Sequence, residues 1–241
     1  MMLHISEVRN IFAEKLKNED FVIDKTGVKM LEIVGETFIA DEDRIFGEVN
    51  QDYVQRELDW YKSMSLNVRD IPGGVKQETN PPEIWMTVAD PDGFINSNYG
   101  WCIWSYDNYD QYDNVIAELK ANPSSRRTSM IYTRPSMWED YNFQGRSDFM
   151  CTWGVDYLIR NGKLNAIVKM RSNDSLFGYK NDRFFQKYVL DEMSDELGVP
   201  VGDIYWQSSS LHIYERHFYM VDHYSQTGEL SVKRSQYSGK W

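Results

Sequence analysis

Two residues in this sequence carry groups that could act directly on a substrate. Cys151 lies in the strand-like stretch "RSDFMCTWG", where a cysteine is either a small buried hydrophobic residue or a nucleophile. Glu57 follows Val54 by three residues and precedes Tyr61 by four, so a helix would place its carboxylate on the apolar face. Burial there would raise its pKa and suit a general acid or base. The alternative is a carboxylate that reaches the helix edge or pairs with a lysine.

Other side chains have the chemistry of a phosphate and sugar site. The stretch "SSRR" at residues 124–127 and the pair Arg171 and Ser172 offer guanidinium and hydroxyl donors that suit one phosphate, with surface ion pairs as the alternative. His212 and Tyr214 alternate along a strand-like stretch, so both point to one face and could hydrogen-bond a sugar hydroxyl. A structural histidine is equally compatible. These residue types favour an enzyme that acts on a small phosphorylated substrate.

The composition indicates a folded globular protein and limits its partners. The 241 residues are 41% hydrophobic and 15% aromatic, which is enough for a large core. The formal charge of −11 opposes general attraction to nucleic acid, whereas a few converging arginines can still hold one phosphate. Without an apolar stretch of membrane-spanning length or a signal peptide, a cytoplasmic protein is expected. The two cysteines, Cys102 and Cys151, indicate free thiols, and no metal site is expected.

The elements that must position these residues form an α+β pattern with a mostly antiparallel or mixed sheet and flanking helices. Without a repeat or linker, one domain over residues 1–241 is the simplest interpretation. Apolar spacing predicts a first helix capped by Ser6 and further helices around residues 54–61, 112–119 and 182–197. Strands are predicted on both sides of a turn within residues 21–40, in a hairpin around Asn161 and Gly162, and from residue 203 into a last helix.

Longer motifs resemble a known group of enzymes. The stretch "SSRR", the strand-borne Cys151, "RSNDSLFGYKND" and "LHIYERH", in that order, resemble the thymidylate synthase superfamily. Within it, "FVIDKTGVK", "QRELDWYKS", "INSNYGW", "YTRPSM" and "SDFMCT" resemble the bacteriophage deoxycytidylate (dCMP) 5-hydroxymethylase branch. The likeness covers nearly the whole chain. It implies a thymidylate synthase-like fold, a sheet-mediated homodimer in the host bacterial cytoplasm, and a phage nucleotide-precursor complex as a candidate partner.

The resemblance also implies a role for each matching residue. The nucleophile that adds to C6 of the pyrimidine would be Cys151, and the general acid or base would be Glu57. The 5′-phosphate would be held by Arg171 and Ser172 of one chain and by Arg126 and Arg127 of the partner chain, with Lys25 standing where synthases usually carry an arginine. The sugar 3′-hydroxyl would be held by His212 and Tyr214, and the co-substrate 5,10-methylenetetrahydrofolate by Trp85, Tyr99 and Asp174.

Departures from the synthase pattern bear on the product. Synthases read uracil with an asparagine, and the matching residue here is Asp182. A carboxyl group can accept from the amine of cytosine and, when protonated, donate to N3, so Asp182 favours cytosine. A shift of one residue would bring in Asn181 and restore uracil. Thr152 and Val88 replace a histidine and a tryptophan of the synthases, and the lost bulk would admit the water that gives a hydroxymethyl product.

The implied function is therefore conversion of dCMP, methylenetetrahydrofolate and water to 5-hydroxymethyl-dCMP and tetrahydrofolate. Three alternatives stay open from the sequence. A dUMP hydroxymethylase or thymidylate synthase would turn over uracil nucleotides, and a CMP 5-hydroxymethylase would accept ribose. A non-catalytic protein that retains the fold would leave the whole set of site residues idle.

Overall fold

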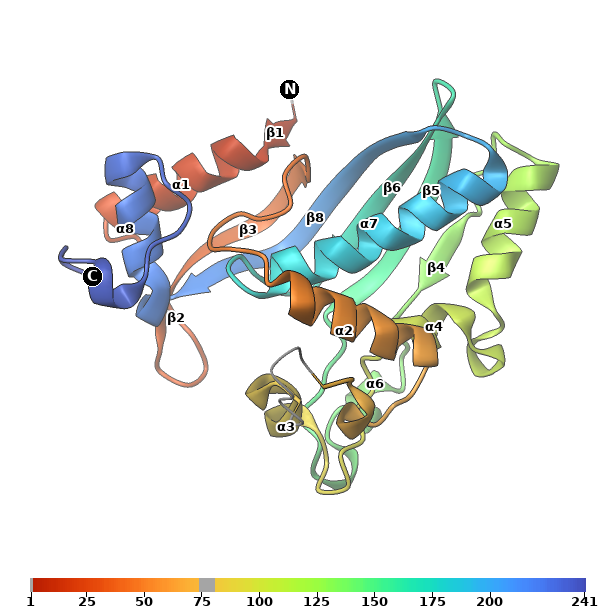
Figure 1. The fold of residues 1–241 in the computed structure, drawn as a ribbon, viewed down its shortest axis with the longest axis horizontal. Helices are drawn as coiled ribbons and strands as arrows, with labels where there is room; N and C mark the ends of the chain where they lie inside the picture. Colours follow the sequence, from red (N-terminus) through yellow and green to blue (C-terminus); the bar gives the residue numbers. More distant parts are fainter. Residues whose placement is uncertain (1, 74–80) are drawn as a thin grey trace. The chain divides into compact units, whose positions relative to one another are not determined.

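The computed structural model describes residues 2–73 and 81–241 (Figure 1). Two compact units divide the chain. The first unit comprises Met1–Val49, Ile167–Tyr188 and Asp203–Trp241, and the second comprises Asn50–Ala166 and Val189–Gly202. Within the described ranges, no helix is both long enough and apolar enough to cross a membrane. The single domain expected over residues 1–241 stays a prediction.

The first unit joins a pair of helices to a set of strands. It contains β1 (Leu3–His4), α1 (Ile5–Lys17), β2 (Val22–Ile23), β3 (Lys29–Ile39), β7 (Asn173–Asp174), most of β8 (Val201–Tyr214), a 3-10 turn (Glu215–His217), α8 (Phe218–Thr227) and a second 3-10 turn (Arg234–Gln236). Helices α1 and α8 pack against each other (Figure 1). Strand β3 runs parallel to β1 and antiparallel to β8, in a register that puts Glu32 opposite His212.

The second unit contains most of the helices. They are α2 (Gln51–Ser63), α3 (Glu83–Val88), α4 (Tyr99–Trp104), α5 (Gln111–Ala121) and α6 (Met137–Asp140), with 3-10 turns at Val68–Asp70, Tyr106–Asn108 and Phe143–Gly145. Its strands are β4 (Ser129–Ile131) and β5 (Thr152–Arg160), which pair antiparallel. Helix α4 packs against both α2 and α5.

Three long segments belong partly to each unit: β6 (Lys163–Met170), α7 (Gly178–Leu197) and β8, whose first two residues fall in the second unit. Hydrogen bonding orders the strands as β1-β3-β8-β6-β5-β4, with β2 beside β3 and β7 beside β8. Because parallel and antiparallel pairs both occur, the predicted mixed sheet is confirmed.

Most predicted elements are confirmed, and their causes are local. Asn161 and Gly162 have φ angles of 52° and 74°, the positive values that a two-residue hairpin turn between β5 and β6 requires. Helix α2 begins after Asn50, whose side chain accepts from the backbone N–H of Tyr53. It ends at Met64 in the left-handed conformation.

Two predicted helix starts are wrong. Ser6 lies inside α1 and does not cap it, because the helix begins at Ile5 and the Glu7 carboxylate accepts from the backbone N–H of His4. Helix α7 begins at Gly178 rather than near Asp182. There the side chain of Asp174 accepts from the backbone N–H groups of the two residues that precede Gly178, which orders the chain before the helix starts.

Candidate active site

Glu57 is buried on α2 and hydrogen-bonded. Only 5% of its surface is exposed, and its Oε1 accepts from the Tyr53 hydroxyl at 2.5 Å and from the Trp85 indole N–H at 3.2 Å. Burial raises the pKa of Glu57 to about 7, while the hydrogen bonds from Tyr53 and Trp85 oppose that rise. The predicted place on the apolar face is confirmed. The edge and lysine-pair alternatives do not apply, since the carboxylate is enclosed and its donors are a phenol and an indole.

Cys151 is the last residue before β5 and is half-buried. Its Sγ lies 3.9 Å from the backbone oxygen of Phe149. The other cysteine, Cys102, is only 1% exposed, and burial raises the pKa of its thiol to about 12. Cys102 therefore stays a protonated core residue, whereas Cys151, directly before β5, is only half-buried, and a nucleophile must be accessible.

The two aromatic residues expected at the folate site belong to one ring cluster of the second unit, in which Trp60 and Tyr61 join them. Trp85 lies on α3, and its ring meets Trp60 edge-on at 5.2 Å between centroids. Tyr99 begins α4, is 5% exposed, and stacks on Tyr61 at 5.4 Å. Packing fixes both rings, so neither depends on a ligand for its orientation.

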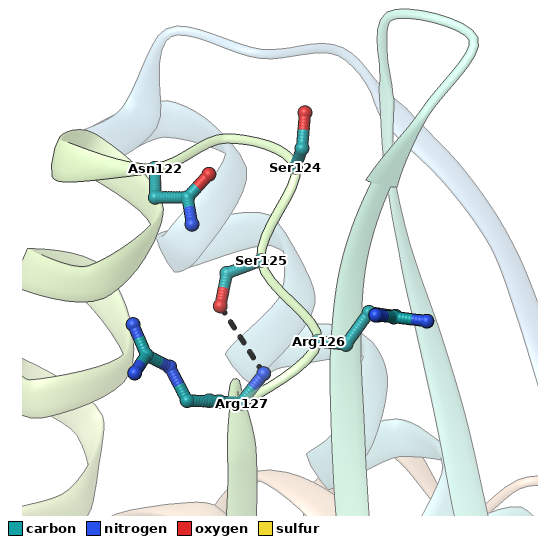
Figure 2. A pocket seen from close by; sticks show the side chains of 5 residues that line it. All are labelled: Asn122, Ser124, Ser125, Arg126 and Arg127. Carbon is teal, nitrogen blue, oxygen red and sulfur yellow. Dashed lines mark hydrogen bonds between the residues drawn. The ribbon is translucent and has the colours of Figure 1, made fainter.

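Arg126 and Arg127 lie in the loop between α5 and β4, where both are exposed (Figure 2). They line a pocket together with Asn122, Ser124 and Ser125. Their side chains point in different directions, and the Arg127 guanidinium is 3.0 Å from the Glu118 carboxylate although 80% of the arginine side chain is exposed. An ion pair this exposed contributes little stability, so Arg127 is available for another anion.

A second set of predicted residues lies in the first unit, around β7. Arg171 and Ser172 precede β7 and are half-buried. The side-chain amide of Asn173 donates to Oδ2 of Asp182 at 2.8 Å, and β7 pairs with β8 so that Asp174 stands beside His212. The local fold thereby brings Asp182, Asp174 and His212 into the same unit, whereas the folate residues Trp85 and Tyr99 belong to the other.

The remaining sugar and phosphate residues lie on β8 and on the β2–β3 turn. His212 is 7% exposed, and its ring is 5.1 Å from that of Tyr214 on the same strand face, as their alternation predicts. The hydroxyl of Ser210 donates to the Glu32 carboxylate on the neighbouring strand and lies 3.4 Å from Nδ1 of His212. Lys25 is exposed in the turn between β2 and β3.

Some side chains of these clusters were not singled out from the sequence. Tyr53 precedes Glu57 by four residues, a spacing that places both on one helix face, and this signal could have identified it. Asn173 had no such signal, because it meets Asp182 through the turn that precedes α7. Across residues 2–73 and 81–241, no group of three or more His, Cys, Asp or Glu side chains is arranged to hold a metal ion.

Comparisons with known proteins agree with this architecture. The family model described as "Thymidylate synthase" matches residues 6–233. The deoxycytidylate 5-hydroxymethyltransferases of Enterobacteria phages T2 and T6 are 55% and 56% identical to this chain, over 98% of its length and 97% of theirs.

Among solved structures, thermostable thymidylate synthase A from Bacillus subtilis superposes with a TM-score of 0.64. It is 21% identical, and the match covers 87% of this chain and 81% of that one. The expected thymidylate synthase-like fold is confirmed. With a family model matching nearly the whole length and relatives more than half identical, the chain belongs to the thymidylate synthase family.

Proposed function

We propose that this protein is a deoxycytidylate 5-hydroxymethyltransferase. It converts dCMP, 5,10-methylenetetrahydrofolate and water to 5-hydroxymethyl-dCMP and tetrahydrofolate. The observation that carries the proposal is the 55–56% identity, over 98% of the chain, to phage proteins with that name. Such an enzyme acts in the cytoplasm of an infected bacterium.

Cys151 starts the reaction. Its thiolate adds to C6 of the cytosine ring, which makes C5 a nucleophile toward the one-carbon unit that the folate supplies. Expulsion of the same sulfur in the last step restores the aromatic ring. The half-buried position of Cys151 directly before β5 supports this role, because the strand fixes the backbone of a residue that is not fully enclosed.

Glu57 moves protons during the cycle. The C5 proton must leave before the exocyclic methylene forms, and a water must be deprotonated as it adds to that methylene. A carboxyl group with a pKa of about 7 exists in both forms near neutral pH, as an efficient general acid and base requires. Val88 and Thr152 occupy positions where synthases carry a tryptophan and a histidine, and these smaller side chains leave space for that water.

Asp182 selects cytosine. Its Oδ2 accepts from the Asn173 amide at 2.8 Å, which orients the carboxyl group. The carboxyl group can accept from the amine of cytosine and, when protonated, donate to N3. Uracil presents an oxygen and an N–H at these positions, for which an asparagine is the better match.

Phosphate and sugar complete the substrate site. Arg171, Ser172 and Lys25 supply donors for the 5′-phosphate from the same chain, and Arg126 and Arg127 supply guanidinium groups from the second chain of a homodimer. The exposure of both loop arginines supports donation to a partner. His212 and Tyr214 hold the 3′-hydroxyl, while Asp174, Trp85 and Tyr99 contact or shape the folate site.

Tritium release from C5-labelled nucleotide, with the product mass recorded in the same tube, tests the proposal. With methylenetetrahydrofolate we expect release from dCMP and a product heavier by one CH₂O unit, and little release from dUMP or CMP. Asp182→Asn is the matched variant, because it changes one group and should shift turnover from dCMP toward dUMP. Release from dUMP by the wild-type protein, or no release from any of the three nucleotides, would contradict the proposal.

A further inference from the structure

The proposed proton carrier, Glu57, belongs to a cluster of three hydrogen-bonded side chains. The indole N–H of Trp85 lies 2.9 Å from the Tyr53 oxygen and 3.2 Å from Oε1 of Glu57, and the Tyr53 oxygen lies 2.5 Å from that same Oε1. All three residues belong to the second unit, on α2 and α3. Family membership by itself assigns Tyr53 no role.

Counting protons assigns a direction to each bond. An indole N–H can only donate, so Trp85 is the donor in both of its contacts. The Tyr53 oxygen accepts from Trp85 and has one hydrogen of its own, which is directed to Glu57. Because Oε1 receives two donors, the proton of a neutral Glu57 resides on the other oxygen, Oε2.

The phenol remains a donor over the working pH range. Burial and the adjacent Glu57 carboxylate raise the pKa of Tyr53 well above its usual value. A chain of bonds from Trp85 through Tyr53 to Glu57 also strengthens each member, since a hydroxyl that accepts a hydrogen bond becomes a better donor.

Burial raises the pKa of Glu57, and the hydrogen bonds from Tyr53 and Trp85 lower it. The charged and titratable groups on the surrounding helices are paired, exposed or protonated. Arg56 of α2 pairs with Asp52 at 3.1 Å, and Glu83 of α3 is exposed. Helix α4, which packs on α2, carries Tyr99 and Cys102, and burial keeps the Cys102 thiol protonated by raising its pKa to about 12.

We propose that Tyr53 is a positioning residue for Glu57: its hydroxyl fixes Oε1 as a hydrogen-bond acceptor and makes Oε2 the oxygen that gains and loses the proton. This inference rests on the proposed function, in which Glu57 exchanges protons with the nucleotide and with water. Tyr53 itself contacts Glu57 and Trp85, and acts on the reaction through the carboxylate.

The test is Tyr53→Phe, followed by ¹³C NMR of carboxyl-labelled glutamate, with the Glu57 signal assigned by its loss in Glu57→Gln. Removing a donor from a carboxylate should raise the Glu57 titration midpoint by about one pH unit. The ionised fraction at pH 7 then falls about fivefold, and kcat should fall with it. The deficit should shrink as the pH rises above 8, while KM for dCMP stays unchanged.

Controls separate positioning from a structural role. Tyr106→Phe removes a hydroxyl from a residue that is 89% exposed, so it should leave both midpoint and kcat unchanged. A 3-fluorotyrosine incorporated at position 53 keeps the shape of the side chain, so it provides a second test if Tyr53→Phe does not fold. Its more acidic hydroxyl donates a stronger hydrogen bond, so the Glu57 titration midpoint should fall.

An unmoved Glu57 midpoint in folded Tyr53→Phe, or a kcat deficit of equal size at every pH, would overturn the inference. Failure of the proposed function is distinguishable from this result. It would appear as a wild-type protein that makes no hydroxymethyl product, whereas the NMR midpoint is measured without turnover.

Discussion

At the scale of single residues, burial decides what a side chain can do. Glu57 and Glu83 are both glutamates on neighbouring helices, yet one is enclosed and the other exposed. Burial raises the pKa of Glu57 to about 7 from an ordinary value of 4.5. The same burial that makes Glu57 suitable for proton transfer should therefore lower the stability of the folded protein at neutral pH.

Replacing Glu57 with glutamine should expose this cost as a pH-dependent stability difference. Between pH 4.5 and about 7 the folded state keeps the Glu57 proton that the unfolded chain has lost, so wild-type stability falls as pH rises through this window and then levels off. Glu57→Gln lacks this titration. Its free energy of unfolding should therefore gain about 3 kcal/mol relative to wild type between pH 4.5 and pH 8, measured by urea denaturation.

Glu83→Gln is the control for that experiment, because it removes the same charge from an exposed site on α3. Its difference from wild type should stay nearly constant with pH. A Glu57→Gln curve that parallels the wild-type curve across the whole range would show that Glu57 titrates normally in the folded state.

The sequence predicted the setting of a residue only where a regular spacing or a motif indicated it. Val54, Glu57 and Tyr61 share a helix face, so the burial of Glu57 was predictable from period alone. The bond from Asn173 to Asp182 was not, since it joins a two-residue strand to the second turn of a helix. The roles assigned to Cys151, Asp182 and the phosphate and sugar residues stay predictions, and Asp182→Asn tests one of them.

At the scale of elements, one glycine sets how closely two helices approach. A Cβ atom added to Gly100 of α4 would lie 1.9 Å from the backbone oxygen of Tyr61 on α2. The obstacle is a main-chain atom, so a rotamer change cannot relieve the overlap. These two helices carry Tyr99 and Glu57, and their separation therefore affects both sides of the proposed site.

Gly100→Ala should destabilise the protein by about 2 kcal/mol or more, because overpacking against a backbone outweighs the gain of about 1 kcal/mol that alanine offers inside a helix. Urea denaturation measures the loss. Ala117→Gly, on an exposed face of α5, is the control and should cost about 1 kcal/mol from helix propensity alone. A Gly100→Ala protein as stable as wild type would mean that α4 can move away from α2 at little cost.

Element prediction succeeded where one residue type decides the conformation and failed where local side chains compete to end or begin a helix. The hairpin turn at Asn161 and Gly162 needs only the conformational freedom of two residues. The start of α1 depends on a choice between two competing caps, and the reciprocal contact of His4 with Glu7 prevails over the hydroxyl of Ser6. Periodicity also could not fix where α7 starts, since Asp174 orders the chain before the apolar repeat begins.

At the scale of the whole molecule, the order of the motifs along the sequence predicted the fold. Motifs spread along nearly the whole chain identified the family. Their order and spacing are informative because residues that are distant in sequence must meet in one site. Strand order and register, such as Glu32 opposite His212, required the structure. The homodimer stays a prediction, and the loop arginines offer a way to test it.

Mixing two inactive variants tests whether the site is shared between subunits. Cys151→Ser lacks the nucleophile but keeps the loop arginines, and the double variant Arg126→Ala and Arg127→Ala has the opposite defect. If each site takes its arginines from the partner chain, a mixed dimer has one complete site and one site that lacks both the cysteine and the arginines. Random pairing of equal amounts makes half of the dimers mixed, so the sample should regain about a quarter of wild-type activity per chain. Light scattering confirms that dimers are present.

Unrestored activity in a sample of mixed dimers would show that Arg126 and Arg127 serve their own chain. The exposure of Arg127 and its weak pairing with Glu118 favour restoration, because little is lost when the guanidinium turns toward a partner's phosphate site.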